Sequence, residues 1–267
     1  MRYLQKVGVT LVLGAALLSL PAMAADMDDD LKMDLVPELG SIEARTGWYV
    51  RGDAGYLADL GGDSSYRTFD GGSYTLASGS GSYSKDVSLN LGVGYTFTDM
   101  FRADVTFGRI SSAFEESGAC DPSFPAECER SALADFAGYS VLANGYVDLG
   151  TIIGLTPYVG AGAGYTYLKW DDVQTQNRCG SSLCNGSAVS SHPGESGWRF
   201  TYALMAGVAY DVSDRLKLDV GYRYMNIDGG GMYGWDVASS DAGATGFQGG
   251  HDNISTHEIR VGLRIAF

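Results

Sequence analysis

The sequence predicts an all-β protein in which eight antiparallel strands close into a transmembrane β-barrel with short periplasmic turns and long extracellular loops. Two observations lead to this prediction. Eight segments alternate large apolar residues with polar or small ones, which is the period of a strand with two different faces. The seven connections between these segments alternate long and short along the chain. Closure is expected because hydrocarbon offers no partner to the backbone groups of an open sheet edge.

The first four predicted strands are joined by two long connections and one short turn. The second of them is the most regular, because its odd-numbered residues from Val87 to Phe97 are all large and apolar. In the fourth, Leu142 interrupts the polar parity, so we expect either a bulge or an apolar position inside the barrel. The predicted bounds are 47–57, 87–97, 101–108 and 136–149.

A short connection near 150–154 leads to the last four predicted strands, which are again joined by two long connections and one short turn, at 212–214. The fifth strand places glycine at 160, 162 and 164 on its polar parity, which suits a narrow interior. The eighth alternates apolar residues from Ile259 to Phe267 with Glu258, Arg260 and Arg264. The predicted bounds are 157–167, 198–210, 216–224 and 256–267.

The amino-terminal region predicts export. Arg2 and Lys6 precede an apolar run that ends before an A-x-A pattern, so we expect a signal peptide at 1–24. This run is too short for a membrane-spanning helix. An acidic, mobile periplasmic segment is expected at 25–46 and the barrel at 47–267. The net charge of −14 becomes two units more negative without Arg2 and Lys6, which argues against nucleic acid as a partner.

The apolar parity is expected to face lipid rather than the barrel axis. Its Trp, Tyr, Phe, Leu and Val side chains are too bulky for the interior of eight strands, whereas the other parity is small or charged. A soluble barrel with the opposite orientation is the alternative. Aromatic residues near the strand ends are expected at the lipid interface: Trp48, Phe97, Phe101, Trp170, Trp198, Phe200, Tyr210 and Phe267.

Charged residues on the inward parity are expected to form a cross-linking network, because a buried charge is costly unless it is paired. We expect this network to fill the interior rather than to catalyse a reaction, and we expect the barrel to be plugged or narrowly conducting. Its predicted members are Arg51, Asp53, Arg102, Asp104, Asp148, Arg199, Lys217, Asp219, Arg223, Glu258, Arg260 and Arg264.

Two of the long loops each contain two cysteines, which in an exported protein suggests disulfides. The local pairs Cys120–Cys128 and Cys179–Cys184 are the economical arrangement, and pairing between the loops is the alternative. The thiols have no histidine at zinc-site spacing, so we predict no metal site and no cofactor.

The histidines are also weighed as catalytic candidates. His251 and Ser255 are close in sequence and could form an activated nucleophile. The residues after His251 do not give the H-x-S-N pattern of a lipid A deacylase, so we expect a solvated loop histidine and no enzymatic activity.

The segments T-G-W-Y-V-R-G-D-A-G-Y at 46–56 and H-E-I-R-V-G-L-R-I-A-F at 257–267 resemble those of the small outer-membrane β-barrel family. The resemblance is to opacity-type surface antigens and the major small outer-membrane proteins of alphaproteobacteria. It implies residence in the Gram-negative outer membrane, amid lipid and lipopolysaccharide. It also implies insertion by the barrel assembly machinery, with Phe267 as the assembly signal.

Three functions compete. A structural surface protein that supports the envelope and displays loops to a host or surface ligand is the favoured reading. A narrow porin for small solutes is the alternative, and a lipid-modifying outer-membrane enzyme comes third.

Overall fold

The computed structural model describes residues 46–61, 64–70, 73–84, 86–120, 127–184, 189–234 and 246–267. The chain divides into two units, Met1–Ile42 and Glu43–Phe267, and every described residue belongs to the second. The predicted signal peptide, and the acidic segment up to residue 45, lie outside the described residues.

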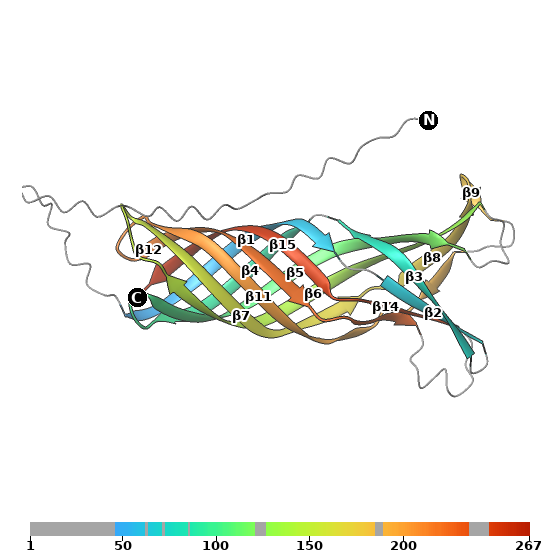
Figure 1. The fold of residues 1–267 in the computed structure, drawn as a ribbon, viewed down its shortest axis with the longest axis horizontal. Helices are drawn as coiled ribbons and strands as arrows, with labels where there is room; N and C mark the ends of the chain where they lie inside the picture. The colour runs from blue at the N-terminus through green and yellow to red at the C-terminus, as the bar shows by residue number, and fades with distance from the viewer. Residues whose placement is uncertain are drawn as a thin grey trace, which may run out of the picture. The chain divides into compact units, whose positions relative to one another are not determined.

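Eight long strands pair in a closed antiparallel ring, which confirms the predicted fold class. Each strand pairs with the next around the ring, and the last pairs back with the first, with Arg51 opposite Arg264. Figure 1 shows these strands side by side around the ring. In ring order they are β1 (Gly47–Gly61), β4 (Val87–Thr96), β5 (Phe101–Ala119), β6 (Cys128–Asp148), β7 (Leu155–Trp170), β11 (Ser196–Asp211), β12 (Leu216–Ile227) and β15 (Ile254–Ala266).

The two faces of these strands have the predicted orientation. On β4, Leu91 is 68% exposed, whereas its neighbour Asn90 is buried. On β15, Val261 is 50% exposed and Arg260 is buried. Exposed apolar side chains on every strand and buried charges beneath them are stable only if hydrocarbon surrounds the wall. None of the described residues belongs to a helix that could span a membrane.

The short turns are stabilised by hydroxyl side chains. Thr98 Oγ1 accepts hydrogen bonds from the backbone N–H groups of Met100 (3.2 Å) and Phe101 (3.0 Å). Ser213 Oγ accepts in the same way from Leu216 (3.1 Å). A hydroxyl that takes over a backbone acceptor role favours a tight turn over a longer strand, and these residues therefore end β4 and β11.

The long connections are not simple loops, and in this respect the sequence prediction was wrong. Strand β5 continues well past its predicted end, and β6 begins well before its predicted start at 136. Further strands pair beside both of them. Figure 1 shows several of these strands continuing the wall beyond one end of the ring. They are β2 (Ser64–Asp70), β3 (Ser73–Tyr83), β8 (Val173–Cys179), β9 (Ser182–Leu183), β10 (Ser190–His192), β13 (Gly230–Gly234) and β14 (Gly246–His251).

These additional strands form a second ring at the extracellular end. Neighbouring pairs run from β10 through β8, β6, β5, β3, β2 and β14 to β13. The remaining gap is bridged by pairing of Gly194 with Tyr233 and by a hydrogen bond of 2.7 Å from Glu195 N to Met232 O. The extracellular wall is therefore closed along the described residues in the same way as the membrane-spanning wall.

Candidate functional site

The periplasmic half of the barrel interior is a polar layer centred on Arg51 and Asp104. Arg51 forms an ion pair with Asp53 on its own strand (2.8 Å) and with Asp104 on β5 (3.1 Å), and it donates to the hydroxyl of Tyr146 on β6 (3.0 Å). Asp104 also accepts from Asn144 on β6 (2.7 Å). These contacts cross the interior and join β1 to strands that are not its neighbours.

Three more buried arginines extend this layer. Arg223 pairs with Glu258 (2.6 Å) and reaches Asn90 across the interior (3.1 Å). Arg102 pairs with Asp148 (3.1 Å), and its guanidinium lies 3.9 Å from the centre of the Tyr146 ring. Paired charges and cation–π contacts lower the cost of burying these cations. The third pair, between Arg264 and Asp219, measures 3.1 Å.

Tyrosines complete the polar layer, and each lies directly opposite a glycine on the next strand. Tyr49 is paired with Gly94, Tyr146 with Gly160, and Tyr158 with Gly207. A Cβ atom at any of these glycines would clash with the tyrosine ring or its hydroxyl. Glycine therefore provides the space in which a large ring can lie flat inside a narrow barrel.

The structure brings most of the predicted network together inside the barrel. Ten of the twelve residues are buried: Arg51, Asp53, Arg102, Asp104, Asp148, Asp219, Arg223, Glu258, Arg260 and Arg264. The other two lie at the ends. Lys217 is half-exposed and pairs with Asp211 (2.6 Å) at the periplasmic end, and Arg199 donates to the carbonyl of Gly231 (3.3 Å) at the extracellular end.

Above the polar layer, an apolar cluster fills the extracellular half of the interior. Phe136 packs on Trp170 with ring centres 4.8 Å apart, and Phe114 packs on the same indole at 5.7 Å. All three side chains are at least 98% buried. The cluster contains Leu57, Ile110, Phe114, Ala132, Ala134, Phe136, Leu142, Leu168, Trp170, Val173, Ala203, Met225, Ile227, Met232, Tyr233 and Ile254.

This apolar cluster corrects one prediction and resolves another. Trp170 does not lie at the lipid interface, because it has the inward parity of β7. Leu142 is an apolar position inside the barrel, and the register of β6 is continuous with both neighbours there. The sequence carried a signal for the cluster, since the inward parity of β5, β6 and β7 becomes apolar at Ile110, Phe136 and Leu168. The sequence prediction did not include this cluster, because two of the strands were predicted to stop at 108 and 167 and the third to start only at 136.

His251 is not a solvated loop histidine. It ends β14, is 4% exposed and packs against Trp170 with ring centres 5.6 Å apart. Its Nδ1–H donates to the carbonyl of Asp252 (2.7 Å). Burial lowers the pKa of His251, and the nearby Arg199 lowers it further, while the Asp252 carbonyl opposes the shift. A neutral imidazole therefore forms part of the packing above the apolar cluster.

A cavity of about 770 Å³ lies in the wall at the point where β7 ends and β8 begins to pair with β6 in its place. Carboxylates at Asp135, Asp171 and Asp172 and the amine of Lys169 lie on its lining, next to the indole of Trp170. These carboxylates are not within metal-binding distance of one another as a group. Among the described residues, the only group with potential ligand atoms close enough to share a metal ion is Cys128, Cys179 and Cys184.

The four cysteines lie together at the extracellular end. In the structure, Cys120 is bonded to Cys128 and Cys179 to Cys184, and the described residues include no free cysteine. Sulfurs that are joined in disulfides are not thiolates, so they are poor ligands for a metal ion.

A closed barrel with an apolar outer wall and a filled interior defines an integral protein of the Gram-negative outer membrane. A family model described as outer membrane protein beta-barrel domain matches residues 10–267, and the chain belongs to that family. The resemblance expected from the entry and exit segments is thereby confirmed.

Individual relatives and structures are similar over most of the chain. An uncharacterized protein of Brucella suis biovar 1 is 36% identical over 256 residues, covering 84% of this chain and 86% of the relative. A putative adhesin of Rickettsia typhi is 29% identical over 192 residues, covering 67% and 74%. The crystal structure of the outer membrane protein OprG from Pseudomonas aeruginosa has a TM-score of 0.47 and 17% identity, covering 83% and 97%.

Proposed function

We propose that this protein is a structural surface barrel that supports the outer membrane and displays its extracellular ring, rather than a pore or an enzyme. The observation that carries this proposal is the filled interior. A path along the axis would have to cross both the ion-paired layer around Arg51 and the aromatic cluster around Trp170. Eight strands leave room inside for side chains and little else.

The display role is supported by the extended wall and by the relatives. The strands beyond the membrane form a paired ring, which would hold its outermost segments in fixed positions. A relative from Rickettsia typhi is described as a putative adhesin. We therefore propose that the ring presents a binding surface to a host or surface ligand, with lipid and lipopolysaccharide around the barrel and the assembly machinery acting at insertion.

A catalytic role is not favoured by the surroundings of His251. The Nδ1–H donates to the Asp252 carbonyl, which leaves Nε2 as the nitrogen that could act as a base. This Nε2 is buried and has no hydrogen-bond partner among the described residues, so no hydroxyl group is held in position for it to activate. We propose no enzymatic activity and no cofactor.

Recording in a planar lipid bilayer tests the closed interior. The wild-type barrel should show no stable conductance steps of general-porin size. Replacing Phe114, Phe136 and Trp170 together by alanine should produce small steps, because water and ions would then reach the charged layer.

The matched control removes two stacked rings from the lipid-facing wall. Phe107 and Tyr139 lie 6.4 Å apart and are both exposed, so their double alanine variant should remain closed. Large, stable steps in the wild-type protein would overturn the proposal.

A further inference from the structure

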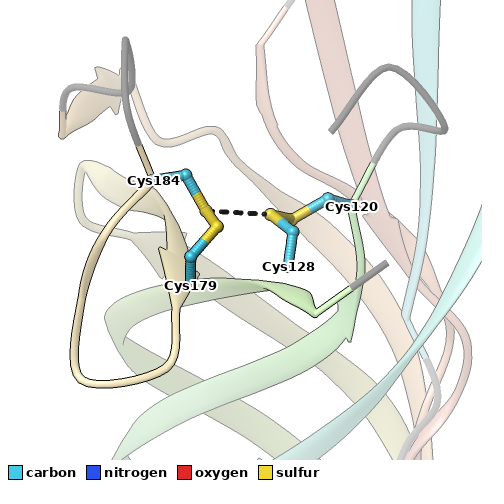
Figure 2. Close-up of a disulfide and its surroundings, with 4 residues drawn as sticks. All are labelled: Cys120, Cys128, Cys179 and Cys184. Atoms are coloured by element: carbon cyan, nitrogen blue, oxygen red, sulfur yellow. Dashed lines mark hydrogen bonds between the residues drawn. A yellow bond between two sulfur atoms is a disulfide. The ribbon is translucent and has the colours of Figure 1, made fainter. Parts of the chain in front are cut away.

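The two disulfides of the extracellular ring are in direct contact. Cys128 on β6 lies opposite Cys179 on β8 in the strand register. The sulfurs of Cys128 and Cys184 are 3.4 Å apart, and Figure 2 shows these two sulfurs facing each other across the dashed line. Neither sulfur carries a proton, so the contact is a van der Waals contact between two S–S bonds. The sulfurs of Cys128, Cys179 and Cys184 all lie within 4.8 Å of one another.

Burial divides each disulfide into an accessible and a protected sulfur. Cys128 and Cys184 are 8% and 3% exposed, whereas Cys120 and Cys179 are half-buried. An external thiolate therefore reaches Cys120 or Cys179 more easily than their partners. The leaving group would therefore be the buried sulfur of each disulfide, Cys128 or Cys184. These two sulfurs are the pair in contact.

We propose that this cluster is a site of thiol–disulfide exchange with small thiols such as glutathione, and that exchange yields a Cys128–Cys184 disulfide. The small thiolate attacks Cys179, forms a mixed disulfide there and releases Cys184 as a thiolate. Cys184 then attacks Cys128, forms the new S–S bond and releases Cys120 as a thiolate. Two S–S bonds and one thiolate are present before and after each step, so no net oxidation occurs.

Attack on the other disulfide leads to the same product. If the small thiolate bonds to Cys120, then Cys128 is released and attacks Cys184, and Cys179 leaves. The two local links, which span 8 and 5 residues, are in either case replaced by one link across 56 residues. That link ties β6 to the end of the β8–β9 hairpin. The site thus exchanges two local loop closures for a cross-link between β6 and the neighbouring β8–β9 hairpin.

Three-cysteine variants of the full chain, purified in detergent, test which sulfurs exchange. Cys179→Ser should carry the Cys128–Cys184 disulfide with Cys120 free, and Cys120→Ser should carry the same disulfide with Cys179 free. Cys128→Ser is the matched control, and it should keep Cys179–Cys184 with Cys120 free. Alkylation in denaturant followed by non-reducing peptide mapping identifies each pair. Cleavage after Glu127 and after Leu183 separates the sulfurs of each native disulfide.

Exchange itself is followed in the wild-type protein, where folding of a variant is not at issue. A limiting pulse of reduced glutathione should produce the cross-linked Cys128–Cys184 peptide, with glutathione on Cys179 or Cys120. The proposal is overturned if glutathione adducts accumulate while Cys184 or Cys128 remains the alkylated thiol. It is equally overturned if Cys179→Ser retains Cys120–Cys128.

Discussion

At the scale of single residues, Asp104 is the acceptor on which three strands of the polar layer converge. Tyr49 and Arg51 reach it from β1 and Asn144 reaches it from β6, while Asp104 itself belongs to β5. Such a buried group is difficult to replace, because removing one partner leaves the others charged or unsatisfied in a place that water does not reach freely.

Replacing Asp104 by leucine should therefore lower the free energy of unfolding by about 3–5 kcal/mol, the usual cost of breaking a buried ion pair. Asp211→Asn provides the comparison, because the Asp211–Lys217 pair is about one-third exposed and should contribute less than about 1 kcal/mol. Guanidinium titration of the barrel in lipid vesicles, followed by tryptophan fluorescence, measures both. Equal losses in the two variants would contradict this account.

At the scale of elements, strand parity was predicted well and strand length was not. Within the membrane, the apolar outer face makes the alternation visible, as in Val87 to Phe97. Beyond the membrane, both faces of a strand can be polar. A paired strand there, such as Ser73–Tyr83, therefore need not alternate apolar with polar residues. The Gly- and Ser-rich stretches were therefore predicted as loops although their backbones pair.

The β13–β14 hairpin should be sensitive to pH through His251. Its pKa is lowered by burial from the ordinary value of about 6.5. Below that value the unfolded chain binds a proton that the folded hairpin excludes, so stability is complete above about pH 6.5 and decreases as the pH falls. Burial and the nearby Arg130 lower the pKa of His192, which packs on Tyr233 of β13, so it acts in the same direction.

Hydrogen exchange of residues 246–254 at pH 7.5 and 5.5, corrected for intrinsic rates, measures this effect. Protection should be lower at pH 5.5 in the wild-type protein. A variant with phenylalanine at both 192 and 251 keeps aromatic packing without a titrating group, and its protection should not change. A wild-type hairpin that is equally protected at both values would refute the assignment.

At the scale of the whole molecule, the alternation of turns and extended strands fixes which end faces the cell exterior. An epitope inserted between Ser181 and Ser182, at the β8–β9 turn, should bind antibody on intact cells. The same epitope between Ser213 and Asp214, in the β11–β12 turn, should bind only after the outer membrane is permeabilised. Flow cytometry distinguishes the two, and staining of the second insertion on intact cells would reverse the topology.

The sequence by itself determined the eight spanning strands, their inward and outward faces and the compartment, because lipid imposes an apolar residue at every second position of a spanning strand. Only the tertiary structure decided which inward residues meet. Arg51 contacts Asp104, Tyr146 lies opposite Gly160, and Cys128 touches Cys184 because of the registers in which the strands pair around the ring. Register depends on closure of the ring as a whole, and a period of two residues contains no information about it.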